Sequence, residues 1–252
     1  MADKTSPKPE KILVVDDQLS MRLTLRGILV KKGYDVTVAE DGARALEQIQ
    51  KDNYRVIFMD IRMPGMNGVQ TFLEMKKTRP NATVIMMTAH ALEDEIKTAL
   101  REGAYTVLHK PFEMDRMLAL LKECLEDRPL VLVVDGNREI CDALKEALEG
   151  YNYRVLFAEN GEQCLDQLQQ RRFQVIILDL KLPDNGLATL RDIKEMRPEA
   201  GVIVLATSAT EQEALEQAMQ FGTIAYLRKP FDPHMIIEIL QKYLPEAPQK
   251  DG

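Results

Sequence analysis

The sequence repeats itself at one fixed distance, and this repeat constrains the fold more than any other feature. Three segments recur: ILVVDD at 12–17 as VLVVDG at 131–136, VIFMDIRMPGMNG at 56–68 as VIILDLKLPDNG at 175–186, and LHKPF at 108–112 as LRKPF at 227–231. All three share an offset of 119 residues, about the length of one small domain. We therefore expect two tandem copies of one fold and not a solenoid of short repeats.

Each copy alternates apolar runs with helical patterns. In the first copy the apolar runs lie at 11–16, 34–39, 55–59, 83–87 and 105–108, and the helical patterns lie near 20–32, 42–51, 68–78, 91–102 and 113–126. Near-continuous apolar runs such as RVIFM and TVIMM are typical of a parallel sheet that helices cover on both faces. The pattern predicts an α/β fold of (βα)₅ domains with right-handed crossovers.

Composition narrows the class of partner. The chain of 252 residues has a net charge of -7, with 20 basic and 20 acidic residues in 1–128 but 13 and 20 in 129–252. Neither half is basic enough to indicate nucleic-acid binding, and nothing indicates a membrane segment. Three cysteines without C-x-x-C spacing argue against a disulfide framework or a zinc site. The N-terminal MADKTSPKPE lacks the apolar core of a signal peptide, so we expect a cytoplasmic protein.

Polar residues stand at the ends of four predicted strands of the first copy. Asp16 and Asp17 follow the first strand, Asp60 the third, Thr88 the fourth and Lys110 the fifth. Open α/β sheets bind ligands beyond the carboxyl ends of their strands, so the fold should gather these side chains into one pocket. Three carboxylates, a hydroxyl and an ammonium suit a hard divalent cation and a phosphoryl group.

Each of these residues also has an ordinary structural interpretation. An aspartate between a strand and a helix is often only an N-cap, which holds for either Asp16 or Asp17 taken alone. Thr88 alone is typical of a strand end, and Lys110 before a proline is typical of a solvated turn. The recurrence of the set in one order and at one offset favours a shared site.

These motifs closely resemble the receiver domain of two-component response regulators, of which the bacterial chemotaxis regulator is a single-domain form. In the first copy the resemblance is carried by Asp16-Asp17, by Asp60 in MDIRMPGMNG, by Thr88 in MMTAH and by Lys110 in HKPF. The resemblance occurs once in each copy, and the two copies together make up nearly the whole chain. It implies two tandem flavodoxin-like (βα)₅ receiver domains, at 11–127 and 130–245, between a mobile leader at 1–10 and a tail at 246–252.

The resemblance also implies roles for these residues. Asp60 would accept a phosphoryl group from a histidine kinase, a phosphotransfer protein or a small acyl phosphate. Asp17 and Asp60 would ligate Mg²⁺ (or Mn²⁺) directly, Asp16 through water, and Arg62 through its backbone carbonyl. Thr88 and Lys110 would bind the phosphate. The Lys-Pro bond of the family is cis, and the face of the fourth helix, fifth strand and fifth helix is its output and homodimer surface.

The second copy departs from this pattern at its acidic pair. The pair reads Asp135-Gly136, so the residue expected to ligate the cation directly has no side chain, although Asp179 and Lys229 remain as phosphoacceptor and phosphate ligand. Asp135 or a water could partly compensate. Counting back from Lys229 selects Thr207 as the switch hydroxyl, whereas aligning the fourth strands selects Ala206. We choose Thr207.

The aromatic switch of the family lies three positions before the lysine. In the second copy this residue is Tyr226, but in the first it is Val107, with Tyr105 two residues earlier. We expect Tyr105 to be a core residue.

Three functions remain open. The first is a response regulator without an output domain, because only PEAPQKDG follows the second copy. Phosphorylation of Asp60, or also of Asp179, would then control binding of an unknown protein partner. The second is a constitutive interaction or dimerisation module with the second copy as a pseudo-receiver. The third is an enzyme that acts on a phosphorylated metabolite through an aspartate nucleophile. This hypothesis is weaker, because such a site needs its nucleophile and a second aspartate two residues apart, whereas Asp16 and Asp17 are adjacent. Beyond self-phosphorylation and autodephosphorylation we expect no enzymatic activity.

Overall fold

The computed structural model describes residues 9–79, 82–89, 92–126, 128–207 and 212–244. The chain divides into two compact units, Met1–Glu126 and Asp127–Gly252. The predicted tail, and the predicted leader apart from its last two residues, lie outside the described residues. Within the described part of the chain, no helix has both the length and the apolar composition needed to cross a bilayer.

The first unit alternates strands and helices along its described residues. They are β1 (Lys11–Val15), α1 (Leu19–Lys31), β2 (Asp35–Ala39), α2 (Gly42–Lys51), β3 (Val56–Asp60), α3 (Gly68–Lys76), β4 (Thr83–Thr88), α4 (Glu93–Arg101), β5 (Thr106–His109) and α5 (Met114–Leu125). The sheet is parallel with strand order β2-β1-β3-β4-β5. The order reverses between β1 and β3, which places the ends of these two strands side by side.

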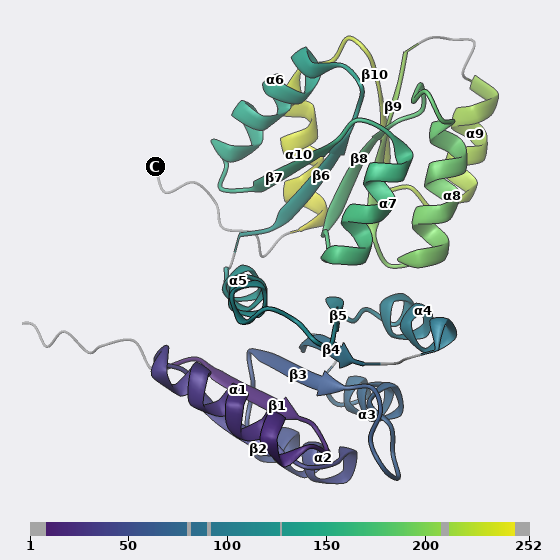
Figure 1. Ribbon diagram of the computed structural model, residues 1–252. Coiled ribbons are helices and arrows are strands. Elements are labelled where there is room, and N and C mark those ends of the chain that lie inside the picture. The colour runs from purple at the N-terminus through teal and green to yellow at the C-terminus, as the bar shows by residue number, and fades with distance from the viewer. Residues whose placement is uncertain (1–8, 80–81, 90–91, 127, 208–211, 245–252) are drawn as a thin grey trace, which may run out of the picture. The chain divides into compact units, whose positions relative to one another are not determined.

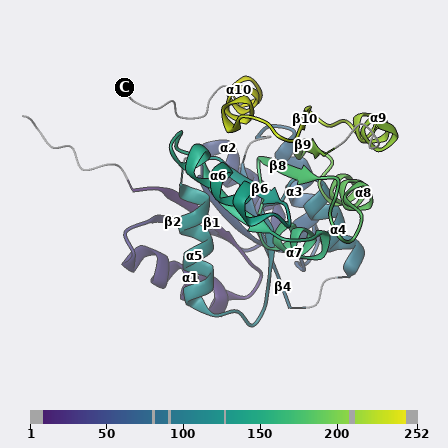
Figure 2. The ribbon, with the colours of Figure 1, turned by 90° about the horizontal axis from the view of Figure 1, so that it is seen from above.

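The second unit repeats this plan. Its elements are β6 (Leu130–Val134), α6 (Arg138–Glu149), β7 (Arg154–Ala158), α7 (Gly161–Gln170), β8 (Val175–Asp179), α8 (Gly186–Met196), β9 (Gly201–Ala206), α9 (Gln212–Gln220), β10 (Ala225–Arg228) and α10 (Pro233–Tyr243). The strand order is β10-β9-β8-β6-β7, which is that of the first sheet counted from its other edge. Figure 2 shows β6, β8, β9 and β10 in this succession.

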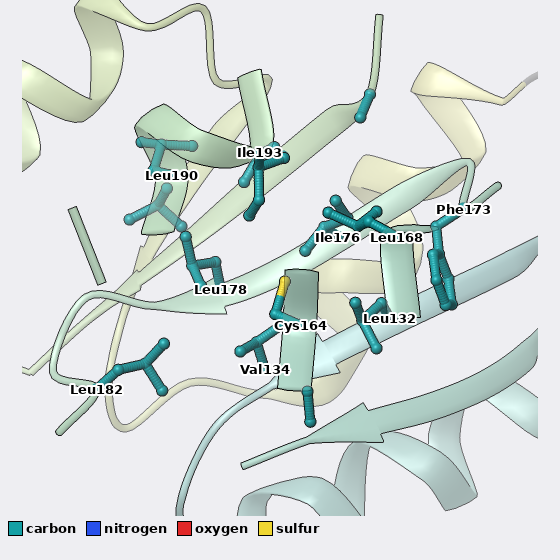
Figure 3. Close-up of a cluster of buried hydrophobic side chains, with 14 of the residues drawn as sticks. Leu132, Val134, Cys164, Leu168, Phe173, Ile176, Leu178, Leu182, Leu190 and Ile193 are labelled. Carbon is teal, nitrogen blue, oxygen red and sulfur yellow. The ribbon is translucent and has the colours of Figure 1, made fainter. Parts of the chain in front are cut away.

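Helices cover both faces of each sheet. In the first unit α1 and α5 pack on one face, and α2, α3 and α4 pack on the other. In the second unit α6 and α10 lie on one side and α7, α8 and α9 on the other (Figure 1). Figure 3 shows how Val134, Ile176 and Leu178 of the strands meet Cys164 and Leu168 of α7 in one buried cluster. Strands apolar on both faces are what such a three-layer arrangement requires.

The predicted α/β fold is confirmed in both units. In the first unit every strand and helix begins and ends within two residues of its expected position. The boundaries could be predicted this closely because each apolar run is flanked by charged or turn-forming residues, which are unfavourable inside the sheet.

A glycine at the start of α3 is required by close packing against β3. A Cβ atom on Gly68 would lie 2.0 Å from the backbone oxygen of Asp60, and one on Gly186 would lie 2.3 Å from the backbone oxygen of Asp179. The preceding residue, Asn67, caps α3 by accepting a hydrogen bond from the Gln70 amide at 2.8 Å. The NG pair of both copies therefore brings a helix start against the strand end that carries the central aspartate.

We predict that Gly68→Ala destabilises the first unit by about 1–3 kcal/mol, because the added methyl group overpacks against backbone. Gly27→Ala is the matched control, since nothing lies within 4 Å of a Cβ atom built there and the residue is inside a helix. This change should stabilise by roughly 0.5–1 kcal/mol. Urea unfolding followed by circular dichroism measures both, and equal effects of the two substitutions would contradict the packing argument.

Candidate functional site

A lysine joins two buried aspartates at the carboxyl ends of the first sheet. Asp16 follows β1, Asp60 ends the adjacent β3, and Lys110 follows β5. The Nζ atom of Lys110 lies 2.6 Å from Oδ2 of Asp16 and 2.6 Å from Oδ2 of Asp60. The side chain of Lys110 is only 9% exposed and those of both aspartates are buried. The fold therefore brings together Asp16, Asp60 and Lys110, three of the five residues that the sequence predicted to meet.

Backbone amides fix the second oxygen of each buried carboxylate. Oδ1 of Asp16 accepts a hydrogen bond from the Gln18 amide at 2.9 Å, and Oδ1 of Asp60 accepts one from the Arg62 amide at 3.2 Å. Asp16 therefore stabilises the turn before α1, as the capping interpretation allows, but the N-cap position itself is Gln18. Each carboxylate is thus held at both of its oxygens.

Asp17 completes a trio of carboxylates. One carboxylate oxygen from each of Asp16, Asp17 and Asp60 lies within 4.8 Å of the others, and Asp17 is the exposed member. Asp17 also lines an open hollow of about 470 Å³ beside the trio. Clustered carboxylate oxygens, one of them open to solvent, fit the ligand preference of Mg²⁺. The role of the Arg62 carbonyl as a further ligand remains a prediction.

Arg22 is a residue of this site that the sequence reasoning missed. Its Nη1 atom donates hydrogen bonds to the backbone oxygens of Asp16 at 2.6 Å and Asp17 at 2.9 Å, and its side chain is buried. It therefore holds the loop that carries the acidic pair. The available signal was its helical spacing, because Arg22 shares the buried face of α1 with Leu25 and Leu29.

Thr88 presents a buried hydroxyl at the end of β4. The residue is fully buried, and its Oγ1 atom has no hydrogen-bond partner among the described residues. Its backbone oxygen accepts from the Lys110 amide at 2.7 Å, and the preceding Met87 pairs with Asp60. A buried hydroxyl without a partner costs about 1–3 kcal/mol, so a group that accepts from it would be bound favourably.

Burial and charge act in opposite directions on the two partners of the site. Burial raises the pKa of the Asp60 carboxyl above its ordinary value, against the lowering effect of the Lys110 ammonium. Burial by itself lowers the pKa of Lys110, but its hydrogen bonds to Asp16 and Asp60 outweigh this effect and leave it raised. Lys110 therefore stays charged at neutral pH.

We predict that Asp60→Asn stabilises the metal-free first unit at neutral pH, because it removes a charge that burial disfavours and that repels Asp16, while Lys110 keeps Asp16 as its partner. Since the folded pKa of Asp60 is raised, its contribution to stability is fully present below its unfolded pKa and is lost as pH rises through its folded pKa. The advantage of the variant should therefore disappear at acidic pH. Urea titrations across pH in a chelating buffer measure this, and a difference independent of pH would be the contrary result.

The second unit reproduces the lysine bridge. Lys229 Nζ lies 2.6 Å from Oδ2 of Asp135 and 2.7 Å from Oδ2 of Asp179, and both aspartates are buried. The Lys110-Pro111 and Lys229-Pro230 peptide bonds are both cis, as the resemblance implies. The bridge and the turn that presents the lysine are therefore common to both units.

The ligands around this second bridge are different. Gly136 stands where the first unit has Asp17, and Cys141 stands where it has Arg22, with its Sγ atom 3.4 Å from the Asp135 backbone oxygen. Burial raises the pKa of the Cys141 thiol to about 11, so the thiol is neutral. No trio of carboxylate, histidine or cysteine ligands occurs among the described residues of this unit.

The choice of Thr207 as the counterpart of Thr88 is wrong. Thr88 pairs with His109, and the corresponding residue beside Arg228 is Ala206, whose backbone oxygen accepts from the Lys229 amide at 2.8 Å. Thr207 is exposed, one residue beyond the end of β9. The segment between β9 and β10 is one residue longer than that between β4 and β5, so counting back from the lysine missed the register by one.

The positions of the aromatic residues differ between the units. Tyr105 is buried in the core of the first unit beside α5, as expected, and Val107 packs against the opposite core. Tyr226 of the second unit is 46% exposed on β10. The part of Tyr226 as a switch residue remains a prediction.

Fold and site together define a class of protein, namely tandem parallel α/β domains with a lysine-bridged aspartate pair beyond the strand ends. The family model of the response regulator receiver domain matches residues 12–122 and again residues 131–241. The chain belongs to this receiver domain family, and the resemblance drawn from its motifs is confirmed.

The chain is also similar to individual proteins. The response regulator receiver protein Anae109_2439 of Anaeromyxobacter sp. (strain Fw109-5) is 30% identical over 233 residues, which is 92% of this chain and 94% of that protein. Sporulation initiation phosphotransferase F of Bacillus subtilis is 36% identical over 116 residues, or 46% of this chain and 94% of that protein. The structure of Vibrio cholerae chemotaxis protein CheY4 has 30% identity and a TM-score of 0.44, covering 46% of this chain and 99% of its own.

Proposed function

We propose that Asp60 accepts a phosphoryl group in two-component signalling and that its phosphorylation controls binding of a protein partner. The observation that carries this proposal is the Lys110 ammonium held at 2.6 Å from Asp60, with Asp16 and Asp17 completing the acidic trio. The matching family, whose members are receiver domains of response regulators, supports the same function.

The chemistry is a transfer of one phosphoryl group. An Asp60 carboxylate oxygen attacks phosphorus, an oxygen–phosphorus bond forms, and the bond from phosphorus to the donor breaks with its electron pair leaving on the donor. Such a step needs neutralisation of charge on the phosphoryl oxygens more than proton transfer. Lys110 supplies a positive charge there, and the buried hydroxyl of Thr88 supplies a hydrogen-bond donor at the end of the neighbouring strand.

The acidic trio would hold the cation of the family. Asp17 and Asp60 would bind Mg²⁺ or Mn²⁺ through carboxylate oxygens, Asp16 through water, and Arg62 through its carbonyl. When bound, the cation neutralises negative charge on the transferring phosphoryl group. Arg22 would not contact the cation, but its hydrogen bonds to the backbone oxygens of Asp16 and Asp17 hold the loop that carries both aspartates.

The proposed partners follow from the chemistry and the family. The phosphoryl donor is a histidine kinase or a phosphotransfer protein, and one relative is named a phosphotransferase of sporulation initiation. The downstream partner is a protein that binds the face formed by α4, β5 and α5. A homodimer through that face is the second form of this interaction.

The number of phosphates on the intact protein tests the proposal. After treatment with acetyl phosphate and Mg²⁺, we expect a mass increase of one phosphate in the wild type and none in Asp60→Asn. Asp179→Asn is the matched control, because it removes the corresponding aspartate of the second unit and should leave incorporation unchanged. Full incorporation in Asp60→Asn would reject the assignment of Asp60.

A second candidate function, favoured by the ligands of the second unit, is a binding domain that acts without phosphate. That unit keeps its lysine bridge but has Gly136 for a carboxylate, Cys141 for an arginine and Ala206 for a hydroxyl. In the first unit the corresponding residues would bind the cation, hold the loop of the acidic pair and bind the phosphoryl group, respectively. We propose that the second unit docks a partner or a second copy in one constitutive state.

Restoring the missing ligands tests this difference between the units. A Cβ atom on Gly136 would meet only the Glu159 backbone oxygen, at 3.7 Å, so an aspartate fits there. We predict that Gly136→Asp combined with Ala206→Thr raises incorporation from one phosphate to two, and that adding Asp179→Asn returns it to one. Two phosphates on the unmodified protein would show that Gly136 and Ala206 are no obstacle.

A further inference from the structure

Helix α4 of the first unit is anchored firmly at its C-terminal end. Its buried residues are Ala99 and Leu100, in the last turn. Just beyond the helix, Lys76 of α3 donates a hydrogen bond to the Glu102 backbone oxygen and lies 3.3 Å from its carboxylate. Burial and an ion pair therefore fix this end to the body of the domain.

The N-terminal end of α4 is attached more weakly. The N-cap Leu92 offers no side-chain hydrogen bond, and Glu93 and Asp94 are exposed. Glu95 supplies the cap instead, because its Oε2 atom accepts from the Leu92 amide at 3.1 Å. Ile96 adds only a partly buried contact with the core.

Arg62 connects this helix end to the phosphoryl acceptor. Its Nη2 atom lies 4.0 Å from Glu95 Oε2, the same oxygen that caps α4. Its backbone amide donates to Asp60 Oδ1 at 3.2 Å. One residue therefore contacts the acceptor through its main chain and the first turn of α4 through its side chain.

The Arg62 side chain has room to change partner. It is 56% exposed, whereas Glu95 is 25% exposed. Both side chains line the open hollow of about 470 Å³ that Asp17 also lines beside the acidic trio. A side chain this exposed is not fixed in place by packing.

We propose that Arg62 is a positioning residue that exchanges Glu95 for the phosphoryl group on Asp60 and so releases the first turn of α4 from the β3–α3 loop. This inference rests on the proposed function of Asp60. A phosphoryl group carries about two negative charges and matches the fork of a guanidinium, whereas Glu95 offers one charge, at 4.0 Å from the Arg62 Nη2 atom. An exposed pair of this kind is weak, so the phosphoryl group is the preferred partner.

The two attachments of α4 determine what this exchange does. The C-terminal attachment through Lys76 and the buried Ala99 and Leu100 does not involve Arg62 and is not altered. The N-terminal attachment through Arg62 is lost. Phosphorylation therefore frees the end of α4 that follows β4, and the helix pivots on its other end.

The first part of the test uses the full-length protein without phosphodonor. Hydrogen exchange of the amides at 92–96 should be about threefold faster in Arg62→Gln and in Glu95→Gln than in the wild type, because each removes one ionic partner. A glutamine at 95 can still cap the helix. The double variant should equal either single variant. Glu93→Gln is the control, since it removes a charge of the same turn that pairs with Lys97 at 2.9 Å and not with Arg62.

The second part adds Mg²⁺ and beryllofluoride, a mimic of the phosphoryl group, with bound fluoride measured by ¹⁹F NMR. Exchange at 92–96 should become about threefold faster in the wild type and in Glu93→Gln, and should not change further in Arg62→Gln. Equal acceleration in Arg62→Gln and wild type would overturn the proposal. If the wild type bound no beryllofluoride, both the proposed function and the change of partner by Arg62 would be rejected. Additive effects of the two substitutions in the first part would reject only the connection between Arg62 and Glu95.

Discussion

One ammonium group between two buried carboxylates is the interaction on which each domain depends. Asp16 and Asp60 stand at the ends of neighbouring strands, where their charges repel and both are buried. Lys110 comes from β5, with β4 lying between it and Asp60. The long flexible stem of a lysine is what allows a charge attached beyond the sheet edge to reach both carboxylates. The second unit has the same strand order and the same lysine bridge between two buried aspartates.

Much of this site could be predicted from sequence because strand ends are local features that topology then gathers. Asp16, Asp60 and Lys110 each end or follow an apolar run, and a parallel sheet brings such ends to one edge. Arg22 could not be found in this way, because an arginine in an amphipathic helix is normally exposed. Only its position on the face of Leu25 marks it as buried, and only the structure shows that backbone oxygens of the acidic loop are its partners.

The failure at Thr207 has a definite physical origin. Register along a strand is fixed by its hydrogen-bond ladder, so alignment of β9 with β4 identifies Ala206 correctly. Counting back from Lys229 instead crosses α9 and its loops, which accept an extra residue without disturbing the sheet. A distance along the chain is therefore reliable within an element and unreliable across a connection.

The differences between the units separate what the bridge does for the fold from what its surroundings do for chemistry. Asp135, Asp179 and Lys229 keep distances of 2.6 and 2.7 Å although the second unit lacks the counterparts of Asp17, Arg22 and Thr88. Loss of the lysine would leave two buried charges unpaired, a change that typically destabilises by about 3–5 kcal/mol. Replacing Asp17 carries no such penalty, since an exposed carboxylate can be changed to glycine with little change in stability. The bridge is therefore needed for the stability of the fold. Whether a domain can bind a cation and a phosphoryl group depends on the groups around the bridge.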